Sequence, residues 1–316
     1  MGLPEAIRST GCRVAVLCGG SSSERAVSLV SGKAVADALE AAGVPCDLFE
    51  LEENRLPENL SPSIHLVLPV IHGTYGEDGR LSAELESRGF AYAGCAQASS
   101  VLCFDKLACK AMADRLGLPV AKDLLLSPTS PIEYGEVASE LGDTFILKPR
   151  RDGSSVGLHL IHQEEDYHGA REDLASSEYI AETFIDGYDL TVGVLNDEAL
   201  GVVAVYPKSG LYDYDHKYTS GMSRYEAPAD LPEVLAARLR QWSLVIFRAC
   251  GCRDLARVDF RLGEDGKAVF LEVNTLPGMT PTSLLPKSAG CLGLTFSELV
   301  LSWTSFAMRR MEGCNG

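Results

Sequence analysis

The stretch ARVDFRLGEDGKAVFLEVN, residues 256–274, contains two short segments in which apolar and polar side chains alternate. In the first segment, 256–262, one face carries the apolar side chains of Val258, Phe260 and Leu262, and the other carries the charged side chains of Arg257, Asp259 and Arg261. In the second, 267–274, the two sets are Val269, Leu271 and Val273 against Phe270, Glu272 and Asn274. A period of two predicts β-strands. The intervening GEDG, 263–266, predicts a hairpin with a four-residue turn.

The hairpin places a group of oxygen donors on one surface. Across a four-residue turn, odd positions of the first strand share a face with even positions of the second. Asp259 is therefore expected beside Glu272 and Asn274, with Arg257 on the same face. Two carboxylates and an amide oxygen suit Mg²⁺. A solvated polar face with a cross-strand Arg–Asp pair is the alternative. The loop TLPGMTPTS, 275–283, follows Asn274 directly and favours the metal site.

Two further segments have the composition of a phosphate site and its cover. ILKPRRDGSSVG, 146–157, puts Lys148 at the end of a strand before a glycine-serine turn, whose backbone amides can bind phosphate oxygens. An ordinary flexible turn is the alternative. YDYDHKYTSG, 212–221, is rich in tyrosine and predicts either a lid over a site or an exposed loop anchored by its tyrosines. The chain contains neither a P-loop motif nor a dinucleotide fingerprint after its first strand, which argues against a nicotinamide oxidoreductase.

Length, charge and cysteine usage restrict the class of protein. A chain of 316 residues is expected to form two or three domains. The formal charge of −16 argues against nucleic acid and anionic membranes as partners. The first residues lack the apolar core of a secretory signal, so we expect a cytoplasmic protein. Its ten cysteines are scattered and match no zinc-site spacing, which predicts reduced, mostly structural thiols.

The order of elements predicts a mixed α/β chain. RVAVLCGG, 13–20, is typical of a buried strand, and a helix over 21–43 follows with apolar residues at helical spacing: Val27, Val30, Ala34 and Ala38. With strands at 45–51 and 64–73, these elements form a βαβ domain with a parallel sheet. Beyond it the pattern predicts one helix over 99–117, mainly strands over 143–207, a helix over 231–251 and the final hairpin.

Six motifs taken in order resemble the D-alanine–D-alanine ligases of the ATP-grasp superfamily. They are GGSSSERAVSLVSG, HGTYGEDG, KPRRDGSSVG, YDYDHKY, ARVDF and EVNTLPGMTPTS, and they extend over nearly the whole chain. The resemblance implies an α/β (α+β) fold of three domains, 1–98, 99–181 and 182–316, with ATP between two antiparallel sheets. It also implies a reaction in which one D-alanine is phosphorylated by ATP and the amine of a second displaces the phosphate, for peptidoglycan synthesis.

The same resemblance implies which residues bind the nucleotide and metal. Asp259, Glu272 and Asn274 match the ligands of two Mg²⁺ ions, for which Mn²⁺ can substitute. Lys106, Lys148 and Lys217 match the phosphate-binding lysines. Glu182 and Ile185 fall where adenine is held. Asp189, in place of a commoner glutamate, falls where the ribose is contacted.

For the amino acids, the resemblance implies a second set of residues. Glu24, Ser154 and Tyr218 match a hydrogen-bonded trio that orients the first D-alanine, with Glu24 opposite its ammonium group and His72 nearby. Arg257 and the backbone amide of Gly278 match the groups that stabilise the oxyanion, and Ser283 matches the group that receives the second carboxylate. Tyr218 after Lys217 is typical of ligases that make the dipeptide, so we expect D-alanine rather than D-lactate as second substrate. Relatives of this kind form homodimers.

Two other functions remain open at this point. A different carboxylate–amine ligase would share the fold and take other amino acids. A non-catalytic nucleotide-binding protein would keep the fold without the reaction. The set Arg257, Asp259, Glu272 and Asn274 argues against the second of these.

Overall fold

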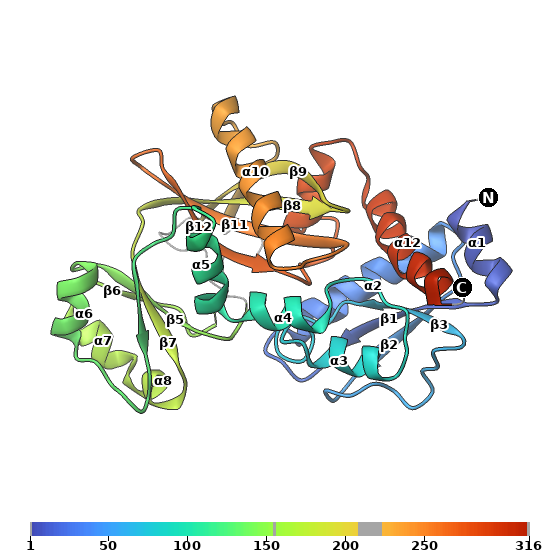
Figure 1. Cartoon of the computed structure of the whole chain (residues 1–316), viewed down its shortest axis with the longest axis horizontal. Coiled ribbons are helices and arrows are strands. Elements are labelled where there is room, and N and C mark those ends of the chain that lie inside the picture. The colour runs from blue at the N-terminus through green and yellow to red at the C-terminus, as the bar shows by residue number, and fades with distance from the viewer. Residues whose placement is uncertain (1, 154–155, 208–222, 315–316) are drawn as a thin grey trace.

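The structure is a computed structural model that describes residues 2–153, 156–207 and 223–314. It contains one parallel and two antiparallel sheets, with helices packed on each (Figure 1). The mixed α/β architecture predicted from the sequence is confirmed.

The parallel sheet has the strand order β2-β1-β3. Its strands are β1 (Arg13–Gly19), β2 (Cys46–Leu51) and β3 (His65–Pro69), and α2 (Arg25–Ala41) packs against it. The helix was predicted correctly, but its buried face was not: Val30 is 62% exposed, whereas Ser31 and Gly32 are buried. A Cβ at Gly32 would collide with Cys18 on β1. Small residues therefore face the sheet because the helix approaches it closely.

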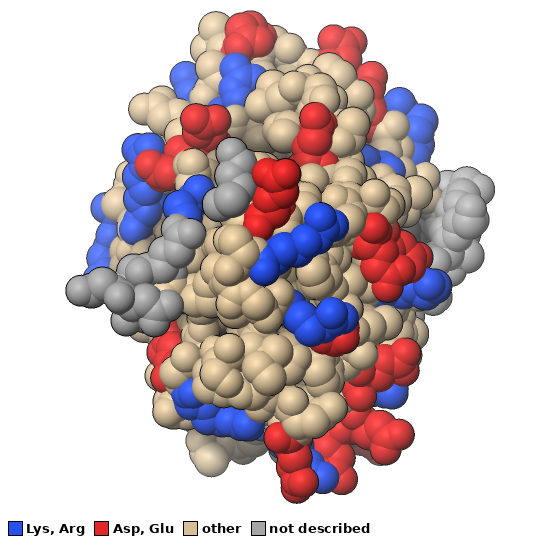
Figure 2. All heavy atoms as spheres, turned by 90° about the vertical axis from the view of Figure 1, so that its right-hand side faces the viewer, with Lys and Arg blue, Asp and Glu red and all other residues tan. Residues whose placement is uncertain are grey.

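Both ends of the described chain pack around this parallel sheet. The surrounding helices are α1 (Leu3–Thr10), α3 (Arg80–Ser87) and α12 (Phe296–Cys314). Although α12 comes last in the chain, it contacts α2 and β3 and buries Trp303 in their core (Figure 1). On the face shown in Figure 2, acidic and basic side chains are interspersed among uncharged ones. Among the described residues, no helix is both long and apolar enough to cross a bilayer.

The larger antiparallel sheet has the order β10-β9-β8-β11-β12. Its strands are β8 (Gly187–Leu195), β9 (Glu198–Pro207), β10 (Ser223–Glu226), β11 (Leu255–Gly263) and β12 (Ala268–Asn274). Helices α5 (Lys106–Arg115) and α10 (Glu233–Ala249) cover one face, over a core that includes Val258, Phe260 and Phe270. Helix α11 (Leu284–Gly290) packs against β8 and β9.

The smaller antiparallel sheet has the order β4-β7-β5-β6. Its strands are β4 (Asp123–Leu126), β5 (Phe145–Pro149), β6 (His159–Ile161) and β7 (Tyr179–Thr183), accompanied by α6 (Tyr134–Leu141), α7 (Glu164–Gly169) and α8 (Arg171–Ser176). Strand β7 continues into the larger sheet through residues 184–186. The division expected between residues 181 and 182 thus falls within β7.

The hairpin of β11 and β12 differs from the predicted one in its turn. The N–H of Gly263 donates to the carbonyl O of Lys267 at 2.9 Å, so the turn has three residues, 264–266. A bulge then leaves Leu271 outside the ladder, and beyond it Asp259 faces Glu272, and Arg257 faces Asn274. The predicted position of Asp259, Glu272 and Asn274 on one face is thus confirmed, but the placement of Val269, Phe270 and Leu271 was wrong, since Val269 pairs with Arg261. Phe270 enters the core, and Leu271 faces the opposite side with Glu272.

The single helix predicted over 99–117 is two helices, α4 (Gln97–Phe104) and α5. The break lies at Asp105, whose backbone is extended and whose side chain accepts a hydrogen bond from the N–H of Ala108 at 3.2 Å. Arg150 Nε and Arg151 Nη2 donate to the same carboxylate at 2.9 and 2.6 Å. These long-range ion pairs fix the break and place Lys106 at the first position of α5.

Candidate active site

A cavity of about 140 Å³ opens between the two antiparallel sheets. Its walls come from α5, β5 and β7 on one side and from β8, β11 and β12 on the other. Seven of the residues expected from the sequence line it: Lys106, Lys148, Glu182, Asp189, Arg257, Asp259 and Glu272. Residues far apart in the chain therefore converge on one space.

The expected metal ligands lie on the cavity side of the hairpin. Asp259 Oδ1 accepts hydrogen bonds from Thr191 Oγ1 at 2.5 Å and Arg257 Nε at 2.9 Å, and its Oδ2 accepts from Arg257 Nη2 at 2.7 Å. The Arg–Asp pair is therefore formed along one strand rather than across two. Asn274 Oδ1 accepts from the N–H of Leu276 at 3.1 Å, which turns the chain away from the sheet. Hard oxygen donors gathered on adjacent strands fit a Mg²⁺ ion.

Glu182 belongs to a buried charge network at the cavity wall. Its carboxylate pairs with Lys148 Nζ at 2.6 Å and with Lys110 Nζ, which also contacts Asp123 Oδ2 at 2.6 Å. Burial alone would raise the pKa of Glu182, but the two ammonium groups outweigh burial and hold that pKa below its ordinary value. Lys110 is 2% exposed and was missed in the sequence. Its spacing of four residues from Lys106 was the available signal, because such residues share a helix face.

Arg261 is a second residue that sequence reasoning left out of the site. Its Nε donates to the carbonyl O of Ile185 at 2.6 Å, its Nη2 to that of Gly187 at 3.1 Å, and its Nη1 to Asp189 Oδ1 at 2.8 Å. It thus holds together the segment expected to contact adenine and ribose. The alternation of β11 had already placed Arg261 on the face of Arg257 and Asp259.

Lys106 connects the cavity to the glycine-serine loop. Its Nζ donates to the carbonyl O of Asp152, and the N–H of Gly153 donates to Asp152 Oδ1 at 2.8 Å. A Cβ at Gly153 would collide with the Glu24 carboxylate, and one at Gly73 would lie 2.7 Å from Glu24 Oε2. The two glycines therefore allow a buried carboxylate from the parallel-sheet region to reach the loop beside the cavity.

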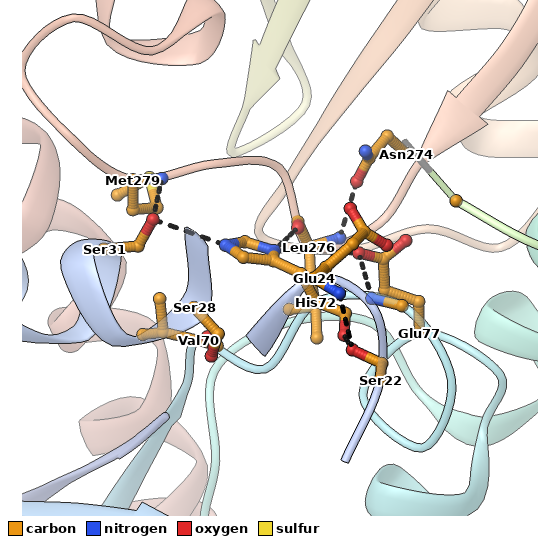
Figure 3. Close-up of polar contacts among 12 residues, drawn as sticks. Ser22, Glu24, Ser28, Ser31, Val70, His72, Glu77, Asn274, Leu276 and Met279 are labelled. Carbon is orange, nitrogen blue, oxygen red and sulfur yellow. Dashed lines mark hydrogen bonds and ion pairs between the residues drawn. The ribbon is translucent and has the colours of Figure 1, made fainter. Parts of the chain in front are cut away.

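Glu24 lies in a polar cluster with His72 (Figure 3). His72 Nδ1 is 2.8 Å from the carbonyl O of Leu276 and 3.7 Å from Glu77 Oε1, and its Nε2 is 3.4 Å from Ser31 Oγ. Burial would lower the pKa of His72, but the carboxylates of Glu77 and Glu24 outweigh it and raise that pKa above its ordinary value. Glu77 was also missed in the sequence.

The loop after Asn274 carries the last expected residues. The N–H of Met279 donates to Ser31 Oγ at 3.3 Å, which ties the loop to α2 (Figure 3). A Cβ at Gly278 would lie 3.1 Å from Ser283 Oγ, so these two residues are neighbours. Ser283 Oγ accepts from the N–H of Thr280 at 3.1 Å. Three other predicted residues, Ser154, Lys217 and Tyr218, lie outside the described residues.

Comparison with known proteins agrees with this arrangement. A family model described as the D-ala D-ala ligase C-terminus matches residues 112–303. The D-alanine–D-alanine ligase of Anaeromyxobacter dehalogenans is 39% identical over 292 residues, which cover 92% of this chain and 95% of that protein. The chain belongs to the D-alanine–D-alanine ligase family. The D-alanine–D-alanine ligase of Acidiphilium cryptum is 40% identical to this chain over 297 residues, which cover 91% of this chain and 95% of that protein.

Solved structures of the D-alanine–D-alanine ligase family have the same fold. The enzyme from Bacillus anthracis complexed with ATP superimposes with a TM-score of 0.83 at 28% identity, covering 96% of this chain and 100% of that one. The VanG D-Ala:D-Ser ligase from Enterococcus faecalis gives a TM-score of 0.77 at 26% identity, covering 94% and 99%. The predicted ATP-grasp fold is thereby confirmed, and the chain is a ligase.

Proposed function

We propose that this ligase joins two D-alanines in an ATP-dependent reaction that passes through D-alanyl phosphate and releases ADP and phosphate. The observation that carries the proposal is the cavity between the antiparallel sheets, which gathers Lys106, Lys148 and Arg257 with Asp259 and Glu272. Cations beside paired carboxylates suit a metal-bound triphosphate, because phosphoryl transfer depends on alignment and charge neutralisation more than on a protein nucleophile.

In the proposed first step, the carboxylate of one D-alanine attacks the γ-phosphorus and ADP leaves. Lys106 and Lys148 orient the phosphates and neutralise their charge. Glu182 and Ile185 hold the adenine and Asp189 the ribose, within the segment that Arg261 braces. Lys217 is assigned to the phosphates by resemblance alone.

In the proposed second step, the amine of the other D-alanine attacks the acyl carbon and phosphate leaves. Arg257 and the amide of Gly278 stabilise the oxyanion, and Ser283 binds the second carboxylate. Glu24 faces the ammonium group of the first D-alanine, supported by His72 and by the assigned partners Ser154 and Tyr218. The buried position of Glu24 beside Gly73 and Gly153 supports this role, because a carboxylate shielded from water attracts an ammonium group more strongly.

Asp259, Glu272 and Asn274 are proposed to hold two Mg²⁺ ions, with Mn²⁺ as a substitute. When bound, the ions supply positive charge to the β- and γ-phosphate oxygens. Replacing Glu272 with glutamine removes one charged donor while keeping the shape of the side chain. We expect the Mg²⁺ concentration for half-maximal ADP release to rise at least about tenfold, because affinity for hard cations follows ligand charge.

The matched control for this variant is Glu264→Gln, the same change in the exposed turn of the same hairpin. Titrating Mg²⁺ at saturating ATP and D-alanine gives the comparison. Equal half-maximal concentrations in the two variants would remove Glu272 from the metal site.

The substrate proposal is tested by measuring ADP release with D-alanine, L-alanine, D-serine and D-lactate, and identifying each product by mass. We expect release and dipeptide with D-alanine and none with L-alanine. Dominant use of D-serine beside D-alanine would instead favour the activity named for the Enterococcus faecalis neighbour. Ester product exceeding dipeptide at pH 7 would overturn the choice of D-alanine over D-lactate.

Further features belong to the same proposal. The need for ATP favours a cytoplasmic location, and the product suits peptidoglycan synthesis. The division into 1–98, 99–181 and 182–316 and a homodimeric assembly are retained as proposals from the family resemblance.

A further inference from the structure

Five cysteines from three separate segments meet behind the larger sheet. Of the nine cysteines whose side chains the structure describes, these are Cys95, Cys103, Cys109, Cys250 and Cys252, and all are buried. Cys103 lies on α4 and Cys109 on α5, whereas Cys250 and Cys252 follow the end of α10. They share a core with Val258 and Phe260, on the side of the sheet away from the carboxylates of the cavity.

Three sulfurs of this cluster have separations close to those of a thiolate metal site. The Sγ atoms of Cys103, Cys109 and Cys250 all lie within 4.8 Å of one another. Cys252 Sγ lies 3.7 Å from Cys103 Sγ but is not within 4.8 Å of all three. A tetrahedral Zn²⁺ ion with Zn–S bonds of about 2.3 Å places its sulfurs about 3.8 Å apart. Shifts of about 1 Å or less would therefore bring the trio to bonding positions around one ion.

We propose that Cys103, Cys109 and Cys250 form a structural binding site for a soft divalent metal ion of the Zn²⁺ class, with Cys252, beside Cys103, moving toward them to supply a fourth thiolate. The ion would tie α4 and α5 to the turn after α10. The turn lies more than a hundred residues further along the chain than these two helices. Thiolates select soft metals over Mg²⁺, so this site and the oxygen site of the cavity take different ions. Because the cluster is buried, the metal enters during folding and contributes to stability.

The surrounding backbone is already braced in the required arrangement. Ser99 Oγ donates to the carbonyl O of Gly251 at 2.6 Å, and the N–H of Gly94 donates to Asp254 Oδ2 at 2.6 Å. Arg253 Nε returns a hydrogen bond to the carbonyl O of Gly94 at 2.7 Å. These bonds dock the turn that carries Cys250 and Cys252 onto the segment before α4, so the site is pre-organised.

A metal accounts for the cluster better than a disulfide does. A disulfide needs two sulfurs at about 2.05 Å and would leave the remaining buried thiols beside it. In the structure one sulfur, that of Cys103, has three sulfur neighbours: Cys109, Cys250 and Cys252. Three sulfurs that all lie close to one another suit shared coordination by one ion rather than a single covalent pair.

The experiment uses the full-length chain, refolded from denaturant in the presence of Zn²⁺ under reducing conditions so that the ion is available as the buried site forms, and then desalted in excess Mg²⁺ to clear the oxygen site. We expect about one Zn²⁺ per chain to remain. Loading with Co²⁺ instead should give the near-ultraviolet charge-transfer band of thiolate ligands, which oxygen ligands do not produce. Cys109→Ala should lower Zn²⁺ affinity at least about tenfold. Cys18→Ala is the matched control, because both cysteines are 0% exposed and only Cys109 belongs to the cluster.

Failure of reduced, folded wild-type protein to retain Zn²⁺ would overturn the proposal, and this result needs no variant. So would a Co²⁺ spectrum without the thiolate band, or equal retention by Cys109→Ala and Cys18→Ala. If Cys109→Ala does not fold, Cys250→Ser replaces it. Thiol titration of the metal-free wild type that shows two cluster cysteines joined as a disulfide would likewise decide against a metal. None of these outcomes depends on D-alanine ligation.

Discussion

The substitution Arg257→Ala is expected to lower kcat for dipeptide formation by about 100- to 1000-fold, the usual effect of losing a pre-organised oxyanion donor. Arg257 lies on β11, opposite Asn274, and lines the cavity. Arg257 Nε and Nη2 donate to the Asp259 carboxylate at 2.9 and 2.7 Å, so the guanidinium is oriented before substrate arrives. In the proposed role, Arg257 stabilises the tetrahedral intermediate and does not bind ATP. The affinity for ATP, measured by calorimetry, is therefore expected to be largely retained.

Two variants show whether the arginine acts through its position and shape. Arg248→Ala removes an exposed arginine paired with Asp197 at 2.6 Å and should leave kcat near the wild-type value. Arg257→Lys keeps the charge but loses the rigid fork, so an intermediate rate is expected. An Arg257→Ala enzyme with wild-type kcat would show that the residue is misassigned. A parallel loss of ATP affinity would move its role to the nucleotide.

Replacing Lys110 with methionine is expected to lower the free energy of unfolding by about 3–5 kcal/mol, as breaking a buried ion pair does. The Lys110 ammonium contacts Glu182, Asp123 Oδ2 and the carbonyl O of Ala121 at 3.1 Å. Without it, two carboxylates remain close together and partly uncompensated. The variant Lys122→Met breaks a pair with Glu140 in which both side chains are more than half exposed, and should cost no more than about 1 kcal/mol. Urea denaturation measures both, and equal losses would contradict the argument.

The difference between wild type and Lys110→Met should depend on pH in a defined direction. The pKa of Glu182 is held below its ordinary value in the folded state, so its ion pairs contribute fully above the unfolded carboxyl pKa of about 4.3. Their contribution is lost as the pH falls through the lower folded pKa. The gap in unfolding free energy between the two proteins should therefore shrink below about pH 4.

Prediction from the sequence succeeded where the signal was local. Alternation along β11 and β12 placed Arg257, Asp259, Glu272 and Asn274 on one face, because successive residues of a strand point to opposite sides. The three-residue turn and the bulge at Leu271 each shift the register by one residue in the same direction. The total shift of two changes the pairing but returns Glu272 and Asn274 to the predicted face beside Asp259. Val269 and Phe270, between the turn and the bulge, and Leu271, at the bulge, were placed on the wrong faces for the same reason.

The sequence by itself determined the order of the sheets, the oxygen donors of the hairpin and the family. Strand periodicity depends on neighbouring residues, and each motif is a short local stretch whose order along the chain can be read directly. Only the tertiary structure decided that Lys110 is buried against Glu182, that Arg261 braces the segment around Ile185, and that α4 breaks from α5 at Asp105. It alone brought together cysteines more than a hundred residues apart in the chain. The positions of these residues depend on what packs against them, and packing partners distant in sequence leave no periodic signal in the chain.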